Sequence, residues 1–292
     1  MTVRVPLRIV VFLAVGVTAA SQSGNLIRIG DAPAVSIAAW RLILASLVLL
    51  PIAGRGLAQV RRLTAGEWGL LALAGAVLAG HLSSWIAAVQ LTTVANAAVF
   101  FSINPVFTAL AGHLLFGERM GPRFLGSLGL GLAGVVVMGA GDLSLAAGDL
   151  AGDGMAVLCS ILFTAYFLLG KRLRQTLDSA VYVAMLYGIA GLCSLVAVAA
   201  MGLPAFDYSG TNWLCFALLA IVPTLIGHTS FNHSLRYVDA GRLSVVTLVE
   251  PLLAGTVAFL AWDEPVTVQA AAGYALIAGS VLLLGWDQRI GR

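Results

Sequence analysis

The sequence predicts an all-α integral membrane protein of ten transmembrane helices, built as two inverted five-helix repeats with both termini in the cytoplasm. Three observations predict this fold class. Of the 292 residues, 60% are hydrophobic and only 10% are charged, whereas soluble domains have about 25% charged residues. The apolar residues form ten runs of transmembrane length, with nearly all positive charges on one side of them. The two halves of the chain also repeat the same unusual residues.

Each of the ten apolar runs is long enough to cross a hydrocarbon core about 30 Å thick. Because lipid offers no hydrogen bonds to the backbone, such runs are predicted to be helices. These spans leave no room for a soluble domain, so an enzyme of this composition would have to act inside the bilayer. Breaks at charges, Gly and Pro place the helices at residues 8–28, 33–53, 67–89, 93–116 and 121–140, and at 150–171, 180–201, 212–235, 240–262 and 267–286.

The positive charges predict the orientation. With the N-terminus in the cytoplasm, every Lys and Arg falls on the inner side except Arg28, on the outer side, and Arg41, within the second span. Such a bias is typical of cytoplasmic loops. The net charge of +3 therefore indicates a rim of cations at the membrane surface, and no nucleic-acid partner is expected. Arg4 and Arg8 before an apolar run also imitate a signal peptide, but the repeat favours keeping this segment as the first helix.

The two halves align at an offset of 146 residues, which predicts one five-helix repeat over residues 1–146 and a second over 147–292. The segment AVQLTTVANAAVFFSINPVFTALAGHLLFGE (88–118) aligns without a gap to SLRYVDAGRLSVVTLVEPLLAGTVAFLAWDE (234–264). Five helices per repeat make the copies inverted, an architecture typical of secondary transporters, although a duplication kept only for folding is the alternative. The coinciding residues are Pro105 with Pro251, Glu118 with Glu264 and, with a one-residue shift, Gly80–His81 with Gly227–His228.

The motif NPVFTALAGHLLFGE, repeated as EPLLAGTVAFLAWDE, resembles the EamA-type repeat of the drug/metabolite transporter superfamily. AAWRLILASLVLL (38–50) is similar to the arginine-bearing second helix of that family. The resemblance covers essentially the whole chain, and implies ten helices, cytoplasmic termini, a central substrate cavity and a bacterial inner membrane location. Within the family, the chain is most similar to the YddG-type exporters of aromatic and other amino acids. One departure is that Tyr187 stands at the position matching Arg41 in the second half.

Ionisable side chains within the spans are the first candidates for a substrate-binding cavity. A charge at the centre of a membrane helix costs about 2.5–3.5 kcal/mol on insertion scales and marks function. The four candidates are Arg41, His81, His228 and Glu250. The histidines could donate to a substrate carboxylate or carry protons, or each could be neutral and bonded to a neighbouring helix. Glu250 could bind a substrate ammonium, carry a proton, or pair with Arg41.

Uncharged polar and aromatic residues extend the predicted cavity. Most of them stand one helical turn from another candidate, and so share a face with it. Flat apolar walls with a few polar anchors suit an amphipathic small molecule, while packing is the alternative role of each aromatic ring. The residues are Gln22 with Asn25 on span one, Trp85 beside His81, Phe100 and Asn104 on span four, Asn232 beside His228, and the phenols Tyr166 and Tyr187.

Pro105 and Pro251 are predicted to be hinges near the centres of spans four and nine. Each proline removes a helical hydrogen bond and disfavours helical geometry in the residue before it, Asn104 or Glu250. Bending at both points would open one side of a central cavity while closing the other.

These residues favour a secondary transporter that exports small amphipathic metabolites, amino acids in particular, by alternating access. One acid, one base and aromatic walls suit a zwitterion, whereas a phosphate-bearing substrate would need several cations. The alternative is a multidrug or lipophilic-cation efflux transporter, which Arg41 would oppose. An intramembrane enzyme is disfavoured because GHTS (227–230) and GHLSS (80–84) form no nucleophile elbow.

No cofactor and no metal are expected, and the partners are the small-molecule substrate and the lipid bilayer. The three cysteines, Cys159, Cys193 and Cys215, lie in apolar runs and are interpreted as small buried hydrophobes. The glycines of span five predict close helix packing within the chain, so a monomer is expected.

Overall fold

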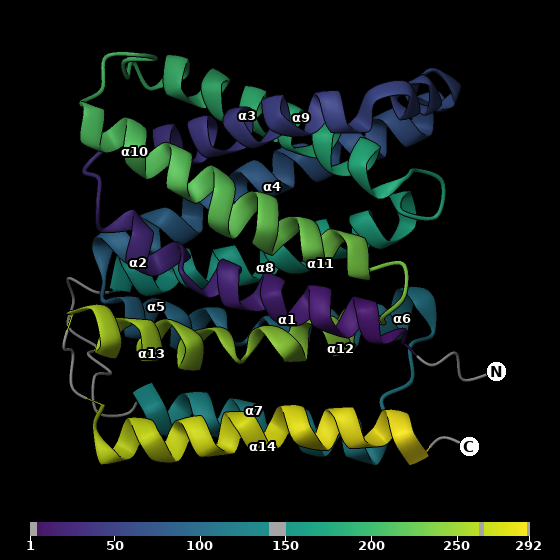
Figure 1. Ribbon diagram of the computed structural model, residues 1–292, viewed down its shortest axis with the longest axis vertical. Helices are drawn as coiled ribbons and strands as arrows, with labels where there is room; N and C mark the ends of the chain where they lie inside the picture. Colours follow the sequence, from purple (N-terminus) through teal and green to yellow (C-terminus); the bar gives the residue numbers. More distant parts are fainter. Residues whose placement is uncertain (1–4, 140–149, 263–265, 291–292) are drawn as a thin grey trace.

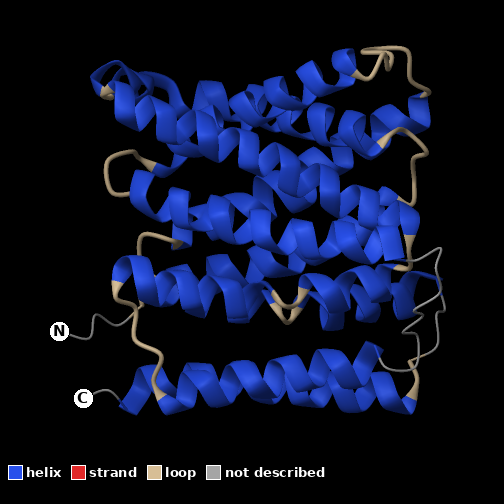
Figure 2. Cartoon of the chain, turned by 180° about the vertical axis from the view of Figure 1, so that it is seen from behind, coloured by secondary structure: helices blue, strands red, loops and turns tan. Residues whose placement is uncertain are grey.

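The computed structural model describes residues 5–139, 150–262 and 266–290. Within these ranges the chain forms helices and no strand (Figure 2). Ten helical spans among the described residues are long and apolar enough to cross a membrane, which confirms the ten predicted spans. Their ends lie within a few residues of the predicted ends. The residues between the predicted fifth and sixth spans (141–149) and Glu264, the repeat partner of Glu118, lie outside the described residues.

The helices follow the order shown in Figure 1. The first five spans are α1 (Leu7–Ser21) with α2 (Ser23–Ile27), α3 (Ala34–Ala53), α4 (Ala65–Leu91), α5 (Val94–Phe101) with α6 (Asn104–Phe116), and α7 (Pro122–Gly139). A short 3-10 helix, η1 (Gly54–Arg62), joins α3 to α4. The second five are α8 (Leu150–Leu173), α9 (Ser179–Ala200), α10 (Gly210–Leu219) with η2 (Ala220–His228) and α11 (Thr229–Ser234), α12 (Ala240–Thr247) with α13 (Glu250–Trp262), and α14 (Val268–Ile290).

Spans four and nine are each broken near the centre, at equivalent places in the two halves. α6 and α13 begin at Asn104 and Glu250, so Pro105 and Pro251 are the second residues of their helices. Proline is tolerated there because the first N–H groups of a helix have no intrahelical partner. The backbone turns more tightly at the breaks, where the N–H of Val106 donates to the carbonyl oxygen of Ile103 at 3.0 Å. The predicted discontinuity at both prolines is therefore present.

Span eight contains a π-helical segment, η2, that was not among the sequence predictions. Pro223 lies inside η2 and cannot donate a backbone hydrogen bond. Two threonine hydroxyls supply bonds there instead: Thr224 donates to the carbonyl oxygen of Leu219 at 2.8 Å, and Thr229 donates to that of Thr224 at 3.2 Å. π-Helical turns are frequent at functional sites, and this one ends at His228.

The main contacts between helices follow the repeat: a contact made by a helix of one half has a counterpart made by the equivalent helix of the other half. α3 packs on α9, α6 on α12 and α7 on α14, so three spans contact their own repeat counterparts. α4 packs on α8 and α1 packs on η2, and these two contacts are the counterparts of each other. This is the pairing that an inverted repeat predicts. The division at residue 146 lies within 140–149, outside the described residues, and stays a prediction.

α7 and α14 form a layer at the edge of the bundle (Figure 1). A Cβ at Gly134 would lie 2.8 Å from the carbonyl oxygen of Gly273, so the two helices can approach this closely because glycine has no side chain. The hydroxyls of Ser127 and Ser280 each donate to the other residue's carbonyl oxygen, at 2.8 and 2.6 Å. Gly131, Gly134 and Gly139 of span five thus serve packing inside the chain, as predicted, whereas a Cβ at Gly121 or Gly129 would meet no neighbouring atom within 4 Å.

The start of α1 and the end of α14 lie at the same end of the helix bundle (Figure 1), which we call the terminal end; the other end is the distal end. The connections after α6, α8 and α11 lie at the terminal end and contain Arg119, Arg174 and Arg236. Arg28, at the end of α2, lies at the distal end. These four cations are therefore distributed as predicted, while assignment of the terminal end to the cytoplasm remains a prediction.

Candidate functional site

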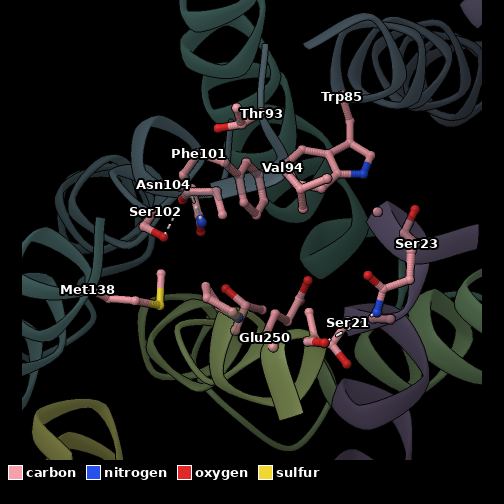
Figure 3. Close-up of a pocket in the computed structure, with 18 of the residues that line it drawn as sticks. Ser21, Ser23, Trp85, Thr93, Val94, Phe101, Ser102, Asn104, Met138 and Glu250 are labelled. Atoms are coloured by element: carbon pink, nitrogen blue, oxygen red, sulfur yellow. Dashed lines mark hydrogen bonds between the residues drawn. The ribbon is translucent and has the colours of Figure 1, made fainter. Parts of the chain in front are cut away.

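A cavity of about 460 Å³ lies in the middle of the bundle, where the broken spans move apart. α5 forms part of one wall and α13 part of the wall that faces it (Figure 3). In this view Phe101 and Asn104 lie opposite Glu250, and Ser21 and Ser23 extend the wall on which Glu250 lies. The cavity therefore forms between segments of the two halves of the chain.

The cavity reaches the distal end of the bundle. Arg28, Thr93 and Thr267 line it, and these residues lie in or beside the connections at that end. Arg28 is exposed, so a cation stands at the mouth of the cavity. A solute at the distal end can thus approach the interior.

Toward the terminal end, α6 and α12 pack together and close the path. A Cβ at Gly241 would lie 3.1 Å from the Cα of Ala109, so the two backbones are in close contact. The Oε1 and Oε2 atoms of Glu118 accept hydrogen bonds from the backbone N–H groups of Ala240 and Gly241, at 3.0 and 3.1 Å. Lys171 of α8 forms an ion pair with the same carboxylate. The broken spans are therefore joined at one end and separated at the other.

His81 and His228 both line the cavity, with ring centroids 5.9 Å apart. Nδ1 of His81 lies 3.1 Å from the carbonyl oxygen of Cys159. Because a carbonyl oxygen only accepts, this contact favours the tautomer with the proton on Nδ1, in which Nε2 of the neutral ring is an acceptor. In this tautomer neutral His81 offers a ligand an acceptor at Nε2, and donation to a substrate carboxylate would require a second proton on the ring. Nδ1 of His228 lies 3.2 Å from the hydroxyl of Tyr166.

Glu250 lies on the cavity wall at the start of α13, and Trp85, Asn104 and Asn25 line the same cavity. The Nδ2 atom of Asn25 donates to the carbonyl oxygen of Ala254 at 3.3 Å, which joins α2 to α13. It also donates to Oε1 of Gln22 at 3.0 Å. Gln22 is not among the lining residues, and it holds Asn25 in place instead.

Arg41 lies behind the cavity wall and not on it, which differs from its predicted place. Its side chain is fully buried, with 0% exposed, because α3 packs on α9 and η2. Nε donates to Thr224 Oγ1 at 2.9 Å, and Nη1 donates to the hydroxyl of Ser23, a lining residue, at 3.4 Å. The described residues contain no ion pair between Arg41 and Glu250, so the pairing considered for them is not formed in this structure.

Tyr166, Tyr187 and Asn232 are also buried behind the wall. Tyr166 bonds to the ring of His228, and Asn232 donates to the carbonyl oxygen of His228 at 2.8 Å. The hydroxyl of Tyr187 donates to the carbonyl oxygen of Thr224 at 3.4 Å. These residues support η2 and His228, because polar groups one turn apart on a buried helix bond to each other and to the backbone.

Phe101, and not the predicted Phe100, faces the cavity. Phe100 packs against Ala88, Ala97 and Ala156 between α4 and α8. The prediction assumed one continuous helix in which Phe100 and Asn104 share a face. The break at residues 102–103 ends that register, so Asn104 lines the cavity from a new helix while Phe100 does not.

Several lining residues were not predicted from the sequence. Phe163 and Phe231 lie in apolar runs that give no signal of a cavity, and Met138 and Tyr274 come from the edge layer of α7 and α14. Ser23 and Arg28 carried a usable signal, because Ser23 adjoins Gln22 and Arg28 is the one cation assigned to the outer side. These six residues belong to the lining set.

The described residues hold no group of three or more His, Cys, Asp or Glu side chains placed to bind a metal ion. Cys159 and Cys215 are buried and Cys193 is half-buried, each with a free thiol. The thiol of Cys159 lies 3.2 Å from Nδ1 of His81, so this cysteine packs beside the cavity.

A family model described as the EamA-like transporter family matches the chain twice, over residues 7–140 and 150–286. A transporter of Archaeoglobus fulgidus is 31% identical over 67% of this chain and 68% of its own length. The aromatic amino acid exporter YddG of Ancylobacter novellus is 26% identical over 60% of this chain and 61% of its own length. The transporter YyaM of Bacillus subtilis is 23% identical over 83% of this chain and 81% of its own length.

One solved crystal structure has the same fold. It superposes with a TM-score of 0.78 over 97% of this chain and 99% of that chain, at 20% sequence identity. With both halves matched by the family model and ten helices that can span a membrane, the chain is a multi-pass membrane protein that belongs to the EamA-like transporter family.

Proposed function

We propose that this protein is a secondary transporter that exports small amphipathic metabolites bearing an amino group, chiefly amino acids with apolar or aromatic side chains. One observation carries the proposal. Among the described lining residues, Glu250 is the one acid, in a cavity otherwise bounded by histidines, small polar groups, apolar and aromatic side chains, and Arg28 at its mouth. A carboxylate in an apolar surrounding binds an ammonium group strongly, because the local dielectric constant is low.

The rest of the cavity suits the remainder of such a molecule. Trp85, Phe101 and Phe163 offer flat apolar surfaces to a side chain. The volume of about 460 Å³ falls within the range of roughly 300–1,000 Å³ found for small-molecule sites. The likeness to an aromatic amino acid exporter supports the same substrate class.

Alternating access is the proposed mechanism, and the two broken spans supply the movement. α6 and α12 are packed together while α5 and α13 line a cavity between them. Bending at residues 102–103 and 248–249 would exchange these two arrangements and expose the cavity to the terminal end. Inverted repeats are the usual basis of such an exchange. No side chain is assigned a covalent step, so the protein is proposed not to be an enzyme.

Export of lipophilic cations is the second candidate, and the position of Arg41 favours it. Arg41 is withdrawn behind Ser23, and the cation that does line the cavity, Arg28, is at its mouth. Glu250 could then attract a cation without direct opposition inside the cavity.

The proposed location is the bacterial inner membrane, as a monomer with the terminal end in the cytoplasm. Single cysteines at Met201 and Arg236, both exposed, test the orientation in a background without native cysteines. In intact cells a membrane-impermeant maleimide should label Met201→Cys alone, and permeabilised cells should label both. Labelling of Arg236→Cys alone in intact cells would reverse the orientation.

The experiment that tests the function uses purified protein in liposomes with and without a pH gradient. We expect labelled phenylalanine to enter these liposomes faster than protein-free ones, and the gradient to show whether protons drive the movement. Movement of tetraphenylphosphonium without phenylalanine would favour the second candidate. Movement of neither, across a panel of labelled amino acids, would contradict both.

A further inference from the structure

We propose that Arg41 and Ser23 recognise the carboxylate of the substrate, so that the cavity selects zwitterions over cations of the same shape. The inference rests on the transport function proposed above, and it names the second charge that the substrate must carry. Arg41 acts through Ser23 and is a positioning residue, because it does not itself line the cavity.

The charge of Arg41 is not compensated by any acid in the described part of the protein. A guanidinium stays protonated in proteins, and this one is 0% exposed. Nη2 is buried without a hydrogen-bond partner among the described residues. A buried and unpaired charge is expensive, and within a membrane helix it is a marker of function.

The hydroxyl groups around Arg41 do not neutralise it. Thr224 donates its own proton to the carbonyl oxygen of Leu219 at 2.8 Å and accepts the bond from Nε of Arg41. The positive charge therefore remains to be balanced by a group that the described residues do not provide. A ligand in the adjoining cavity can provide it.

Ser23 connects this charge to the cavity. Its oxygen accepts a hydrogen bond from Nη1 of Arg41 at 3.4 Å, which leaves its own proton available, and among the described residues it donates to no acceptor. Ser23 lines the cavity. A hydroxyl whose oxygen is bound to a cation is a stronger donor, because successive hydrogen bonds polarise one another. A carboxylate at this point would gain that bond and the attraction of the guanidinium behind it.

Ser23 and Glu250 are held on adjoining parts of the wall (Figure 3). Asn25, two residues after Ser23, donates to the carbonyl oxygen of Ala254, one turn after Glu250. This bond joins α2 to α13, so the positive side of the cavity and its carboxylate keep a defined separation. The cavity thus has one pole for each charge of an amino acid.

The test compares two ligands of the same shape, L-phenylalanine and L-phenylalaninamide, of which the second lacks the carboxylate. Binding to the purified full-length protein is measured by calorimetry for the wild type and four variants: Ser23→Ala, Arg41→Gln, Arg41→Lys and Tyr187→Phe. We expect the wild type to favour phenylalanine by about tenfold, which corresponds to about 1.4 kcal/mol. Ser23→Ala and Arg41→Gln should lower the affinity for phenylalanine and leave the affinity for phenylalaninamide unchanged. The preference for phenylalanine should then fall to about twofold or less.

Two of the variants separate charge from structure. Arg41→Lys keeps the charge and should retain part of the preference. Tyr187→Phe removes a different bond to Thr224, that to its carbonyl oxygen, and should change both affinities equally. If Arg41→Gln does not fold, Ser23→Ala decides the question. An unchanged preference in Ser23→Ala, or tighter binding of phenylalaninamide by the wild type, would overturn the inference. Binding of neither ligand would instead contradict the proposed substrate class.

Discussion

The carboxylate of Glu118 occupies the space that the missing side chain of Gly112 leaves open: its Oε2 atom lies 2.6 Å from the position of a Cβ at Gly112. This placement lets the carboxylate reach the N-terminus of α12, where it accepts hydrogen bonds from Ala240 and Gly241. Acids are favoured at helix N-termini because the first N–H groups are free to donate. A residue that ends span four therefore holds the start of span nine.

This contact predicts that Gly112→Ala loosens the terminal end. The added methyl group would displace the Glu118 carboxylate while keeping its charge. Losing a charge-assisted hydrogen bond costs about 1.5–3 kcal/mol. The fraction of molecules in which α12 can be reached from the terminal end should therefore rise about tenfold or more. The readout is the rate at which a membrane-impermeant thiol reagent, added from that end, modifies Ser244→Cys on α12.

The matched control is Gly129→Ala, since a Cβ at Gly129 would meet no other atom within 4 Å. Its labelling rate should equal that of the parent protein. Equal rates for Gly112→Ala and Gly129→Ala would show that the Glu118 contact does not hold the terminal end closed.

The prolines at the two breaks predict a kinetic effect. Pro251→Ala restores an N–H group that can donate toward the carbonyl oxygen of Thr247, four residues earlier, and should straighten span nine. A net hydrogen bond contributes about 0.5–1.5 kcal/mol. If this bond must break when span nine bends, the activation free energy of transport rises by that amount and turnover slows by about two- to tenfold. Substrate affinity should change little. Pro105→Ala should act in the same way on span four.

Transport rate and dissociation constant, measured side by side for each proline variant, check this prediction. Unchanged turnover would mean that the prolines only accommodate the packing of the breaks, and that bending there is not part of the cycle.

Much of this account could be predicted from the sequence, because the strongest signals are those that the bilayer imposes. Ten apolar runs with charges between them have one economical solution in lipid, so the spans and their order were predicted correctly. His81, His228 and Glu250 were found for a related reason: an ionisable group within a span is expensive wherever it does not face a cavity or a partner.

The site residues that the sequence misplaced or missed depend on three-dimensional packing. Arg41 carries the same signal as Glu250, yet it is withdrawn because α3 packs on α9 and η2. Phe100 and Phe101 differ in their place because a break in the helix changes which face they occupy. Phe163 and Phe231 looked like ordinary packing residues, because an aromatic ring in an apolar run carries no sequence signal that separates a cavity wall from a core.

Glu250 should provide the larger part of the affinity for an amino group. Glu250→Gln keeps the shape and removes the charge, and hydrogen bonds to charged groups contribute about 1.5–3 kcal/mol. Phenylalanine should therefore bind about ten- to a hundredfold more weakly, while 3-phenylpropionate, which has no amino group, should not lose affinity. Equal weakening of both ligands would assign Glu250 a structural role.

His81 offers a prediction with its own control. His81→Asn can keep the donor to the carbonyl oxygen of Cys159 but lacks the Nε2 acceptor, whereas His81→Ala loses both. Transport should fall in both variants while membrane insertion stays intact, as it should for His228→Ala. If His81→Asn transports at the wild-type rate, the histidine matters through its bond to Cys159 and not through its cavity-facing nitrogen.

The central claim is that substrate crosses through the cavity between α5 and α13, and blocking that cavity tests it most directly. Ala254 lines the cavity on α13, and Ala254→Cys in a protein without native cysteines places one reactive group there. A bulky membrane-impermeant thiol reagent, added from the distal end of protein in liposomes, should abolish phenylalanine transport. Excess phenylalanine should slow that reaction. Full transport after complete modification of Ala254→Cys would contradict the account.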